Sequence, residues 1–195
     1  KTYTLKLKQS TPDTPGQPGT GKQPFQIPVK MGLIGESGKD VPLMLEGEAL
    51  ESEAGATETT RVLDFTQGEQ TFVFKNVNGP VVPSLFRDFS APVKLATAQP
   101  DDELIFRMAH DSNPYNRFDA GQQLMSKAMQ GLVTGHEAGE PLQMPREALD
   151  AYGANVAGAL DGDLAFNARM LSLPDFKQDM QQYNPDAVQA VTDFV

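Results

Sequence analysis

The sequence predicts an all-β part followed by an all-α part: an antiparallel β-sandwich and then a run of short helices. Up to about residue 98, apolar residues alternate with polar ones in short stretches that proline and glycine separate, which is the pattern of half-buried strands. From Pro100 onward, apolar residues recur every three or four positions, as they do in amphipathic helices. We therefore expect two domains, a sandwich over residues 1–98 and the N-terminal part of a helical domain over residues 99–195.

Composition narrows the functions that this chain can have. It has 195 residues, 39% of them hydrophobic, which suffices for one large or two small domains with real cores. The absence of cysteine from the sequence excludes disulfides, thiolate metal sites and cysteine nucleophiles. The net charge is −10, and residues 100–195 hold 6 Lys and Arg against 15 Asp and Glu. Such acidity argues against binding to nucleic acid or to an anionic membrane.

The expected strands are short and separated by turns. Alternation marks residues 2–9, 25–34, 41–45, 60–65, 69–77 and 93–95. Residues 10–24 and 46–58 are expected to be loops, because they are rich in turn-forming or small polar residues. The inward-facing side chains are expected to be Tyr3, Leu5, Leu7, Phe25, Ile27, Val29, Met31, Leu33, Phe72 and Phe74. Pro28 indicates an edge strand or a bulge. The series is compatible with an immunoglobulin-like (Ig-like) topology, although the Cys–Trp–Cys core of antibody domains is missing.

Six short helices are expected in the second half. Their starts are marked by acidic residues 101–103, by Asn113-Pro114, by Pro145, by Asp161 or Asp163, by Pro174 and by Asn184-Pro185-Asp186. Gly135 and residues 139–141 are expected to end the second helix. The expected core-facing residues are Phe118, Gln122, Met125, Met129 and Leu132, then Ala148, Leu149, Tyr152, Val156 and Leu160, with Met108 and Met170 as core fillers. Helices this short need stacking neighbours, so we expect the helical part to be truncated.

Two stretches contain histidine and resemble parts of catalytic motifs. His136-Glu137-Ala138-Gly139-Glu140 begins like the zinc motif H-E-x-x-H, but its last position is Glu140, and Gly139 would end the helix. His110-Asp111-Ser112 contains the residue types of a triad. A histidine at a helix C-terminus is the favoured interpretation there, because its positive form is stabilised by the helix dipole.

Three further stretches resemble ion sites, and for each a structural role is favoured. Residues 16–22 are glycine-rich but lack the G-K-[ST] of a phosphate loop. The carboxylates at 101–103 are expected to cap a helix, and those at Glu46, Glu48, Glu51 and Glu53 to lie in a solvated loop and not to bind calcium. We therefore expect no catalytic, metal-binding or substrate-binding residue in this chain.

Several longer runs together resemble one enzyme family. They are residues 9–17 (QSTPDTPGQ), 22–29 (KQPFQIPV), 69–74 (EQTFVF), 82–85 (VPSL), 89–95 (FSAPVKL) and 168–174 (ARMLSLP). In this order, and over nearly the whole chain, they are similar to bacterial aminopeptidase N (alanyl aminopeptidase), of the M1 family of zinc metallopeptidases. The resemblance implies that residues 1 to about 97 correspond to the family's small Ig-like sandwich domain. Residues from about 100 onward then correspond to the first helices of its C-terminal helical domain.

The resemblance also implies where the chemistry of the intact enzyme lies. The family's catalytic domain precedes this region and carries H-E-x-x-H and G-x-M-E-N motifs, neither of which occurs in this sequence. No catalytic or zinc residue is therefore carried over, and zinc is expected in the parent's catalytic domain and not in this chain. The implied role is a scaffold that packs on the missing catalytic domain and the remaining helices, in a cytoplasmic enzyme acting on peptides.

The sequence raises three possible functions for this chain. The first is a non-catalytic fragment of a zinc aminopeptidase, which the start at Lys1 without Met and the apolar last helix favour. The second is a free-standing Ig-like protein-binding module with a helical appendage. The third, an independent hydrolase, would need a nucleophile or metal constellation that the sequence does not offer. We also expect no nucleic acid or membrane partner, because of the acidic charge and the lack of an apolar span.

Overall fold

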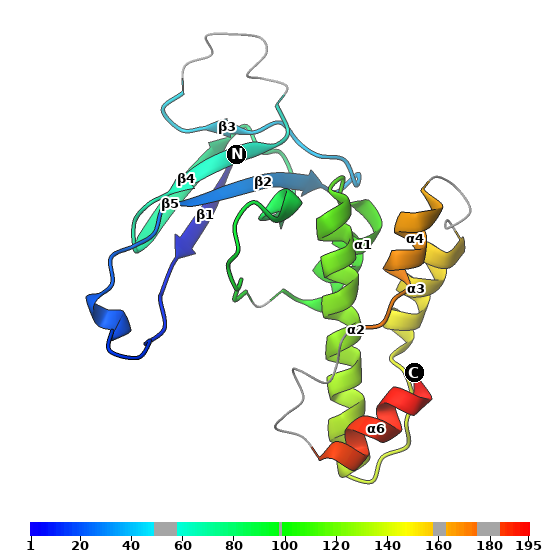
Figure 1. Cartoon of the computed structure of the whole chain (residues 1–195). Helices are drawn as coiled ribbons and strands as arrows, with labels where there is room; N and C mark the ends of the chain where they lie inside the picture. The colour runs from blue at the N-terminus through cyan, green and yellow to red at the C-terminus, as the bar shows by residue number, and fades with distance from the viewer. Residues whose placement is uncertain (49–57, 98, 158–162, 175–183) are drawn as a thin grey trace. The chain divides into compact units, whose positions relative to one another are not determined.

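The computed structural model describes residues 1–48, 58–97, 99–157, 163–174 and 184–195 (Figure 1). They form two compact units. The sandwich unit comprises Lys1–Ala96 together with Asp111–Asn116, and the helical unit comprises Thr97–His110 together with Arg117–Val195. The chain therefore leaves the sandwich unit after Ala96, returns for six residues, and leaves it again after Asn116.

The described residues of the sandwich unit form two three-stranded sheets (Figure 1). Its strands are β1 (Thr2–Lys8), β2 (Ile27–Gly35), β3 (Met44–Leu45), β4 (Arg61–Phe65), β5 (Glu69–Lys75) and β6 (Val81–Ser84). One sheet has the order β1-β5-β3 and the other β4-β2-β6, with every pair antiparallel. The predicted fold class is thereby confirmed for this half of the chain.

The core of this unit combines side chains from both sheets. Its buried members are Leu5, Leu7, Val29, Met31, Leu33, Leu43, Leu63, Phe65, Phe74 and Val77. Leu5 lies opposite Phe72 in the β1–β5 ladder, and Tyr3 lies opposite Phe74. Because side chains alternate across a strand, this register places the predicted apolar face of β1 on the same side as that of β5, where Phe74 is fully buried.

The position of Pro28 follows from a staggered pairing of β2. This strand pairs with β4 over Ile27–Met31 and with β6 only over Gly32–Gly35, so its first half has one ladder. The Ser90 hydroxyl covers the other edge there, accepting from Lys30 N at 3.0 Å and donating to Pro28 O at 2.9 Å. A proline is tolerated at such an edge because it cannot donate to a second ladder, as the sequence predicted.

Two predictions about the sandwich were wrong. Phe25 is 59% exposed and precedes β2, because Gln9 binds both its backbone N–H and its carbonyl. Residues 93–95 form no strand: Val93 and Leu95 are 37% and 45% exposed. Val93 N donates to Ala91 O at 2.9 Å, which closes a tight turn centred on Pro92. The chain therefore bends here, whereas a strand would need it extended.

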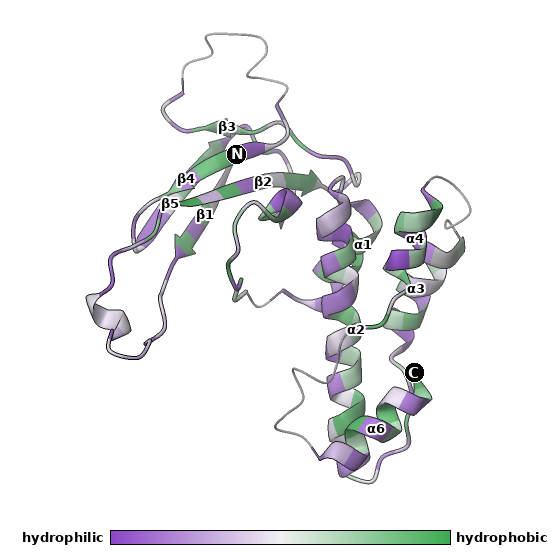
Figure 2. Cartoon of the chain, viewed as in Figure 1, coloured by the Kyte–Doolittle hydropathy of each residue, from purple (hydrophilic) through white to green (hydrophobic). Residues whose placement is uncertain are grey.

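The helical unit contains the helices that the periodicity predicted, as far as it is described. They are α1 (Asp101–His110), α2 (Pro114–Glu137), α3 (Arg146–Ala157), α4 (Leu164–Met170) and α6 (Pro185–Phe194). Figure 2 shows apolar residues recurring along these helices. One core joins α1, α2, α3 and α4 through residues such as Leu104, Leu124 and Met170, and a second joins α2 and α6 through Met129 and Val191.

The predicted helix ends correspond to hydrogen-bonded caps, except that Gly135 lies inside α2, which continues to Glu137. Asn113 Oδ1 accepts from Asn116 N, Asp163 Oδ1 from Ala165 N and Phe166 N, and Asn184 Oδ1 from Asp186 N. At the end of α2, Gly139 has φ +82° while Glu140 N donates to Gly135 O and Gly139 N to His136 O, the bonds of a Schellman motif.

Some expectations for the helical half need correction or lie outside the described residues. The carboxylates at 101–103 form the first turn of α1 and do not precede it. Leu149 is 54% exposed, because the face of α3 that packs into the core carries its neighbours Ala148 and Tyr152. The Val156 side chain, Leu160, Asp161, the helix starting at Pro174 and the 49–57 loop, with Glu51 and Glu53, lie outside what is described. No described helix is long and apolar enough to cross a membrane.

Candidate functional site

The most heavily bonded polar group of the sandwich unit is the side chain of Arg87, which is 2% exposed. It lies in a short 3-10 turn, Arg87–Phe89, which two residues separate from the end of β6. Phe86, Asp88 and Phe89 around it have φ values of 54°, 55° and 54°. Left-handed backbone at non-glycine residues costs on the order of 1–3 kcal/mol each, so neighbouring contacts must hold this turn.

Five side chains from distant parts of the chain form what we call the arginine cluster: Arg87, Asp40, Thr60, Ser84 and Asp111. Arg87 Nε donates to Ser84 Oγ at 2.9 Å, and Nη1 donates to Thr60 Oγ1 at 2.7 Å. Nη1 and Nη2 also bind the two oxygens of Asp40 at 2.8 and 2.9 Å, and Nη2 lies 3.6 Å from Asp111 Oδ1. The planar guanidinium matches a carboxylate in this two-bond arrangement.

Gly32 of β2 leaves the space that the guanidinium occupies. A β-carbon at this position would overlap Cζ and both terminal nitrogens of Arg87. The overlap concerns the head group of a buried side chain that its hydrogen bonds hold in place, and packed interiors tolerate such intrusions poorly. A glycine is therefore required on the buried face of β2.

Residues 111–116, which we call the connection, comprise the loop between α1 and α2 and the first turn of α2. They belong to the same polar network. Ser112 Oγ donates to Asp40 Oδ2 at 2.6 Å. Asn116 Nδ2 donates to Ser84 Oγ at 2.8 Å and to Leu85 O at 2.9 Å. These bonds explain why the loop after α1 and the first turn of α2 are part of the sandwich unit.

Asn113 and Asp88 form a reciprocal pair between the connection and the turn. Asn113 Nδ2 donates to Asp88 Oδ1 at 2.6 Å, and Asp88 N donates to Asn113 Oδ1 at 3.3 Å. Asp88 also forms an ion pair with Lys30 of β2. The turn at 87–89 is thus tied to β2 on one side and to the connection on the other.

Hydrogen bonds favour the ionised form of two carboxylates of this network, Asp40 and Asp88. Burial raises the pKa of Asp40, but hydrogen bonds from Arg87 and Ser112 outweigh it, so the pKa lies below its ordinary value. The pKa of Asp88 is lowered by hydrogen bonds from Lys30 and Asn113. Each acceptor is already occupied by a protein donor, so this arrangement is suited to holding chain segments together and offers no activated nucleophile.

The triad considered from sequence does not assemble. Asp111 accepts from Asn113 N, and Ser112 donates to Asp40, whereas His110 lies in the last turn of α1 with its ring 4.8 Å from that of Phe106. Sequence reasoning missed Arg87 because its partners Asp40 and Thr60 are 47 and 27 residues away. An isolated arginine among aromatic residues at 85–89 was the available signal.

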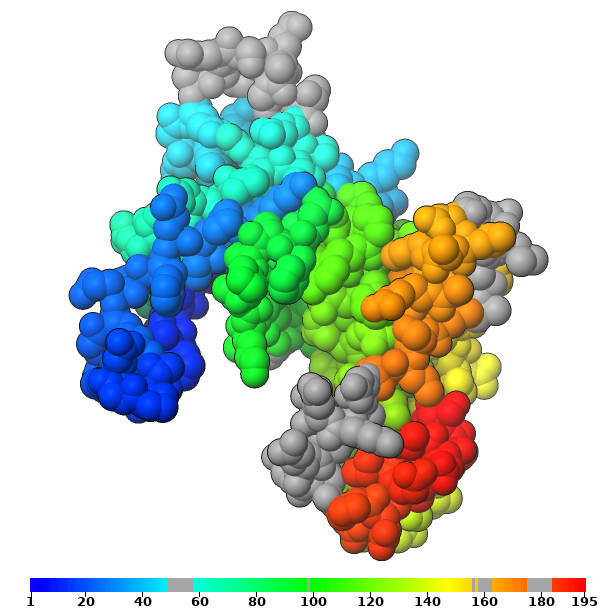
Figure 3. All heavy atoms as spheres, in the orientation of Figure 1, coloured from blue at the N-terminus to red at the C-terminus, as the bar shows by residue number. Residues whose placement is uncertain are grey.

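The other ion-site candidates have structural partners. In the 10–24 loop, the compact blue knob of Figure 3, Lys22 Nζ donates to Pro12 O and Thr14 Oγ1, and Gly19 N donates to Asp13 Oδ1. These bonds occupy the donors that a phosphate would need, and place a carboxylate beside them. Asp101 pairs with Lys127 at 2.9 Å, and Glu48 pairs with Arg61.

The H-E-A-G-E stretch lies at the C-terminus of α2. Glu137 Oε1 accepts from Asn184 N at 3.0 Å, and Gly139 ends the helix. Within the described residues, no group of three or more His, Cys, Asp or Glu side chains could hold a metal ion. These residues therefore do not fit a zinc site.

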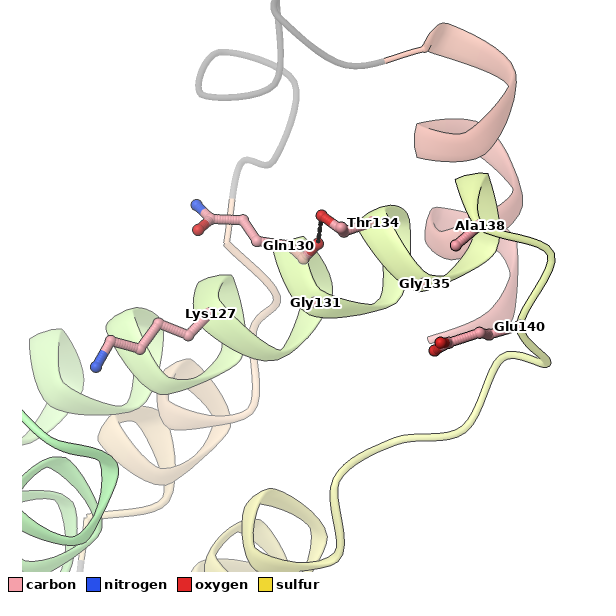
Figure 4. Close-up of a pocket in the computed structure, with 7 residues that line it drawn as sticks. All are labelled: Lys127, Gln130, Gly131, Thr134, Gly135, Ala138 and Glu140. Atoms are coloured by element: carbon pink, nitrogen blue, oxygen red, sulfur yellow. Dashed lines mark hydrogen bonds between the residues drawn. The ribbon is translucent and has the colours of Figure 1, made fainter.

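The helical unit has an open groove of about 700 Å³ between α1, α2 and the start of α3, with Ile105, Leu124 and Met144 in its wall. A second hollow of about 500 Å³ adjoins it along α2 (Figure 4). Its lining is Lys127, Gln130, Gly131, Thr134, Gly135, Ala138 and Glu140, and Thr134 Oγ1 donates to Gln130 O. Figure 4 shows small residues along one side of α2, without converging catalytic groups.

Comparison with known proteins identifies the class to which this fold belongs. Residues 1–98 match the family described as "Domain of unknown function (DUF3458) Ig-like fold", and residues 101–195 match "Domain of unknown function (DUF3458_C) ARM repeats". The chain belongs to the DUF3458 family. The predicted combination of an Ig-like domain and a helical array is confirmed.

The curated relatives that this chain matches are named aminopeptidase N. The chain is 40% identical over 178 residues to aminopeptidase N of Escherichia coli K12, covering 90% of this chain and 19% of that protein. It is 30% identical over 197 residues to aminopeptidase N of Haemophilus influenzae, covering 100% of this chain and 21% of that protein. The resemblance to bacterial aminopeptidase N is thereby confirmed, and the chain spans about a fifth of the length of these relatives.

A solved structure supports the fold independently. The crystal structure of Legionella pneumophila aminopeptidase A in complex with aspartic acid matches with a TM-score of 0.67 at 23% identity, covering 99% of this chain and 19% of that chain. At this identity the similarity concerns the fold alone. Both halves of the chain are included in the match, because it extends over nearly every residue.

Proposed function

We propose that this chain is a non-catalytic part of a zinc aminopeptidase that removes N-terminal amino acids from peptides. Its sandwich and helices act as a scaffold that links the catalytic domain to the helical domain enclosing the active-site chamber. The observation that carries the proposal is the 40% identity to aminopeptidase N over 90% of the chain but only 19% of that relative. The polar network around Arg87 joins separate chain segments, which is what a scaffold requires.

We further propose that the two domains meet near residues 98 and 99. The family matches over 1–98 and 101–195 support this division. The compact units add one refinement, because residues 111–116 pack with the sandwich unit. A short segment that follows the proposed boundary in sequence, residues 111–116, is therefore part of the compact sandwich unit.

Zinc, in this proposal, is bound by the catalytic domain of the parent protein, where it would activate water for peptide hydrolysis. The residues described here do not fit the metal, since His110 and His136 lie in the last turns of two different helices and no cluster of ligands surrounds them. Neither catalytic, metal-binding nor substrate-binding residues are proposed in this chain. A cytoplasmic location is proposed in line with the cysteine-free sequence.

The test compares the natural polypeptide that contains this sequence with the 195-residue chain. Peptide mapping and intact mass are expected to show a protein about five times longer, as its relatives are, with H-E-x-x-H in the additional sequence. That protein should hydrolyse alanyl-amide substrates and lose activity to a chelator. The 195-residue chain should bind no stoichiometric zinc by elemental analysis and show no turnover, with or without added zinc. Turnover by a clean preparation of this chain, or a natural polypeptide confined to it, contradicts the proposal.

A further inference from the structure

We propose that the turn at 86–89 and the connection at 111–116 change conformation together, so that neither leaves its place on the sandwich without releasing the other. The contacts within the sandwich unit carry this inference, and it holds whether or not the parent protein cleaves peptides. It adds a conformational device to what has been proposed as a passive scaffold.

Side-chain bonds help to hold the unfavourable backbone of the turn in place. Phe86, Asp88 and Phe89 have left-handed φ values, which bulky L-residues rarely adopt. Arg87 fixes the turn from the buried side through Ser84, Thr60 and Asp40. Asp88 fixes it from the other side through Lys30 and Asn113. Once these bonds are lost, the backbone relaxes to ordinary φ values, and the position of the turn is lost with them.

The connection uses the same acceptors as the turn. Ser84 Oγ accepts from Arg87 Nε at 2.9 Å and from Asn116 Nδ2 at 2.8 Å. Asp40 Oδ2 accepts from Arg87 Nη1 at 2.8 Å and from Ser112 Oγ at 2.6 Å. Groups that share acceptors in a buried network are energetically coupled, because removing one donor leaves its acceptor undersatisfied and shifts the other donor.

An aromatic contact reports on the same pairing at the surface. The rings of Phe89 and Tyr115 lie 5.6 Å apart, with Phe89 54% and Tyr115 41% exposed. Phe89 belongs to the turn and Tyr115 to the connection, so this contact exists only while both are in place. The residues that flank the connection, His110 and Arg117, belong to the helical unit.

The experiment measures backbone hydrogen exchange by NMR in the 195-residue chain and in Asn113→Ala. The reporters on the turn side are Phe89 N, bonded to Phe86 O, and Lys30 N, bonded to Ser90 Oγ, because neither touches Asn113. We expect both to exchange about tenfold faster in the variant. The matched control is Asn155→Ala, which removes a single asparagine bond to Ala151 O in α3 and should leave both reporters unchanged.

The reverse experiment tests the coupling from the other side. Asp88→Ala should speed exchange at Asn113 N and Asn116 N, whose acceptors are Asp111 Oδ1 and Asn113 Oδ1, although neither bond involves Asp88. If Asn113→Ala speeds hydrogen exchange only in the connection, and Asp88→Ala speeds it only in the turn, the proposal is overturned. Should Asn113→Ala unfold the sandwich, Ser112→Ala removes one bond to Asp40 and is expected to speed the same turn reporters about threefold. Unchanged reporters in Ser112→Ala then count against the coupling.

Discussion

The guanidinium of Arg87 fills the space beside Gly32 that a side chain at this position would need: a β-carbon on Gly32 would overlap it. The glycine lies in the strand β2 and the arginine 55 positions later, so the fit joins two separately formed elements. The arginine cluster depends on it, because the guanidinium reaches Asp40 and Thr60 across the space above Gly32.

Gly32→Ala should therefore destabilise the sandwich strongly. Displacing the guanidinium combines overpacking with the loss of buried hydrogen bonds, and we expect a loss of about 3 kcal/mol in the free energy of unfolding. Urea unfolding followed by circular dichroism measures it. Gly68→Ala is the control in the same unit, since nothing lies within 4 Å of its β-carbon position, and it should stay within about 0.5 kcal/mol of the unchanged chain. Equal effects of the two substitutions would contradict the fit.

Asp40→Ala should cost far more than the loss of an exposed ion-pair partner. It leaves Arg87, 2% exposed, without its two-bond carboxylate, and breaking a buried pair costs about 3–5 kcal/mol. Asp150→Ala is the matched control, because its pair with Arg146 is 3.6 Å long and both side chains are mostly exposed. Such pairs contribute about 0–1 kcal/mol. The same unfolding measurement ranks the two, and a similar small effect for both would show that Arg87 does not rely on Asp40.

Much of this fold was predictable from sequence because its signals are local. Leu5, Leu7 and Phe74 alternate with polar neighbours and are buried, and Asn113 and Asn184 precede prolines that open helices. Each of these signals lies within a few residues of the feature it predicts, as for most strand and cap patterns.

The sequence predictions fail where the local structure depends on contacts with residues far away in the sequence. Val93 and Leu95 have the alternation of a strand, yet the chain turns at Ala91–Val93 and they stay exposed. The arginine cluster joins Arg87 to Asp40, Thr60 and residues of the connection, and periodicity carries no information on which distant polar residues meet. A buried arginine is also rare enough that exposure was the natural expectation.

The arginine cluster predicts how stability depends on pH. Asp40 has a lowered pKa, since hydrogen bonds from Arg87 and Ser112 outweigh its burial. The unfolded chain therefore binds a proton at higher pH than the folded one, so this contribution to stability is fully present above about pH 4 and is lost as pH falls through the folded pKa. Urea unfolding at pH values from neutral to about 2 should show the decline, and Asp40→Asn should make it shallower. An unchanged pH profile in Asp40→Asn would rule out Asp40 as a source.

Ser90→Ala should weaken the first half of β2. The Ser90 hydroxyl accepts a hydrogen bond from Lys30 N and donates one to Pro28 O, at the edge of β2 that has no neighbouring strand in the described part of the chain. Its loss leaves both backbone groups without this partner. We expect a cost of about 1–2 kcal/mol, visible as faster hydrogen exchange at Lys30 N. Ser37→Ala, at an exposed position in the turn after β2, provides the control and should leave that exchange rate unchanged. Slower exchange in Ser90→Ala would mean that another group covers this edge.

Two glycines of the helical unit should respond to alanine with opposite signs. Gly139 has φ +82° at the end of α2, where a β-carbon is strained, so Gly139→Ala is expected to cost about 1 kcal/mol. Gly153 lies inside α3 with nothing within 4 Å of its β-carbon position, so Gly153→Ala should stabilise by about 0.5–1 kcal/mol because glycine is the poorer helix former. Thermal unfolding of both variants under one condition measures the difference. Shifts of the same sign would mean that α2 does not end in the left-handed glycine described here, or that α3 is not helical at Gly153.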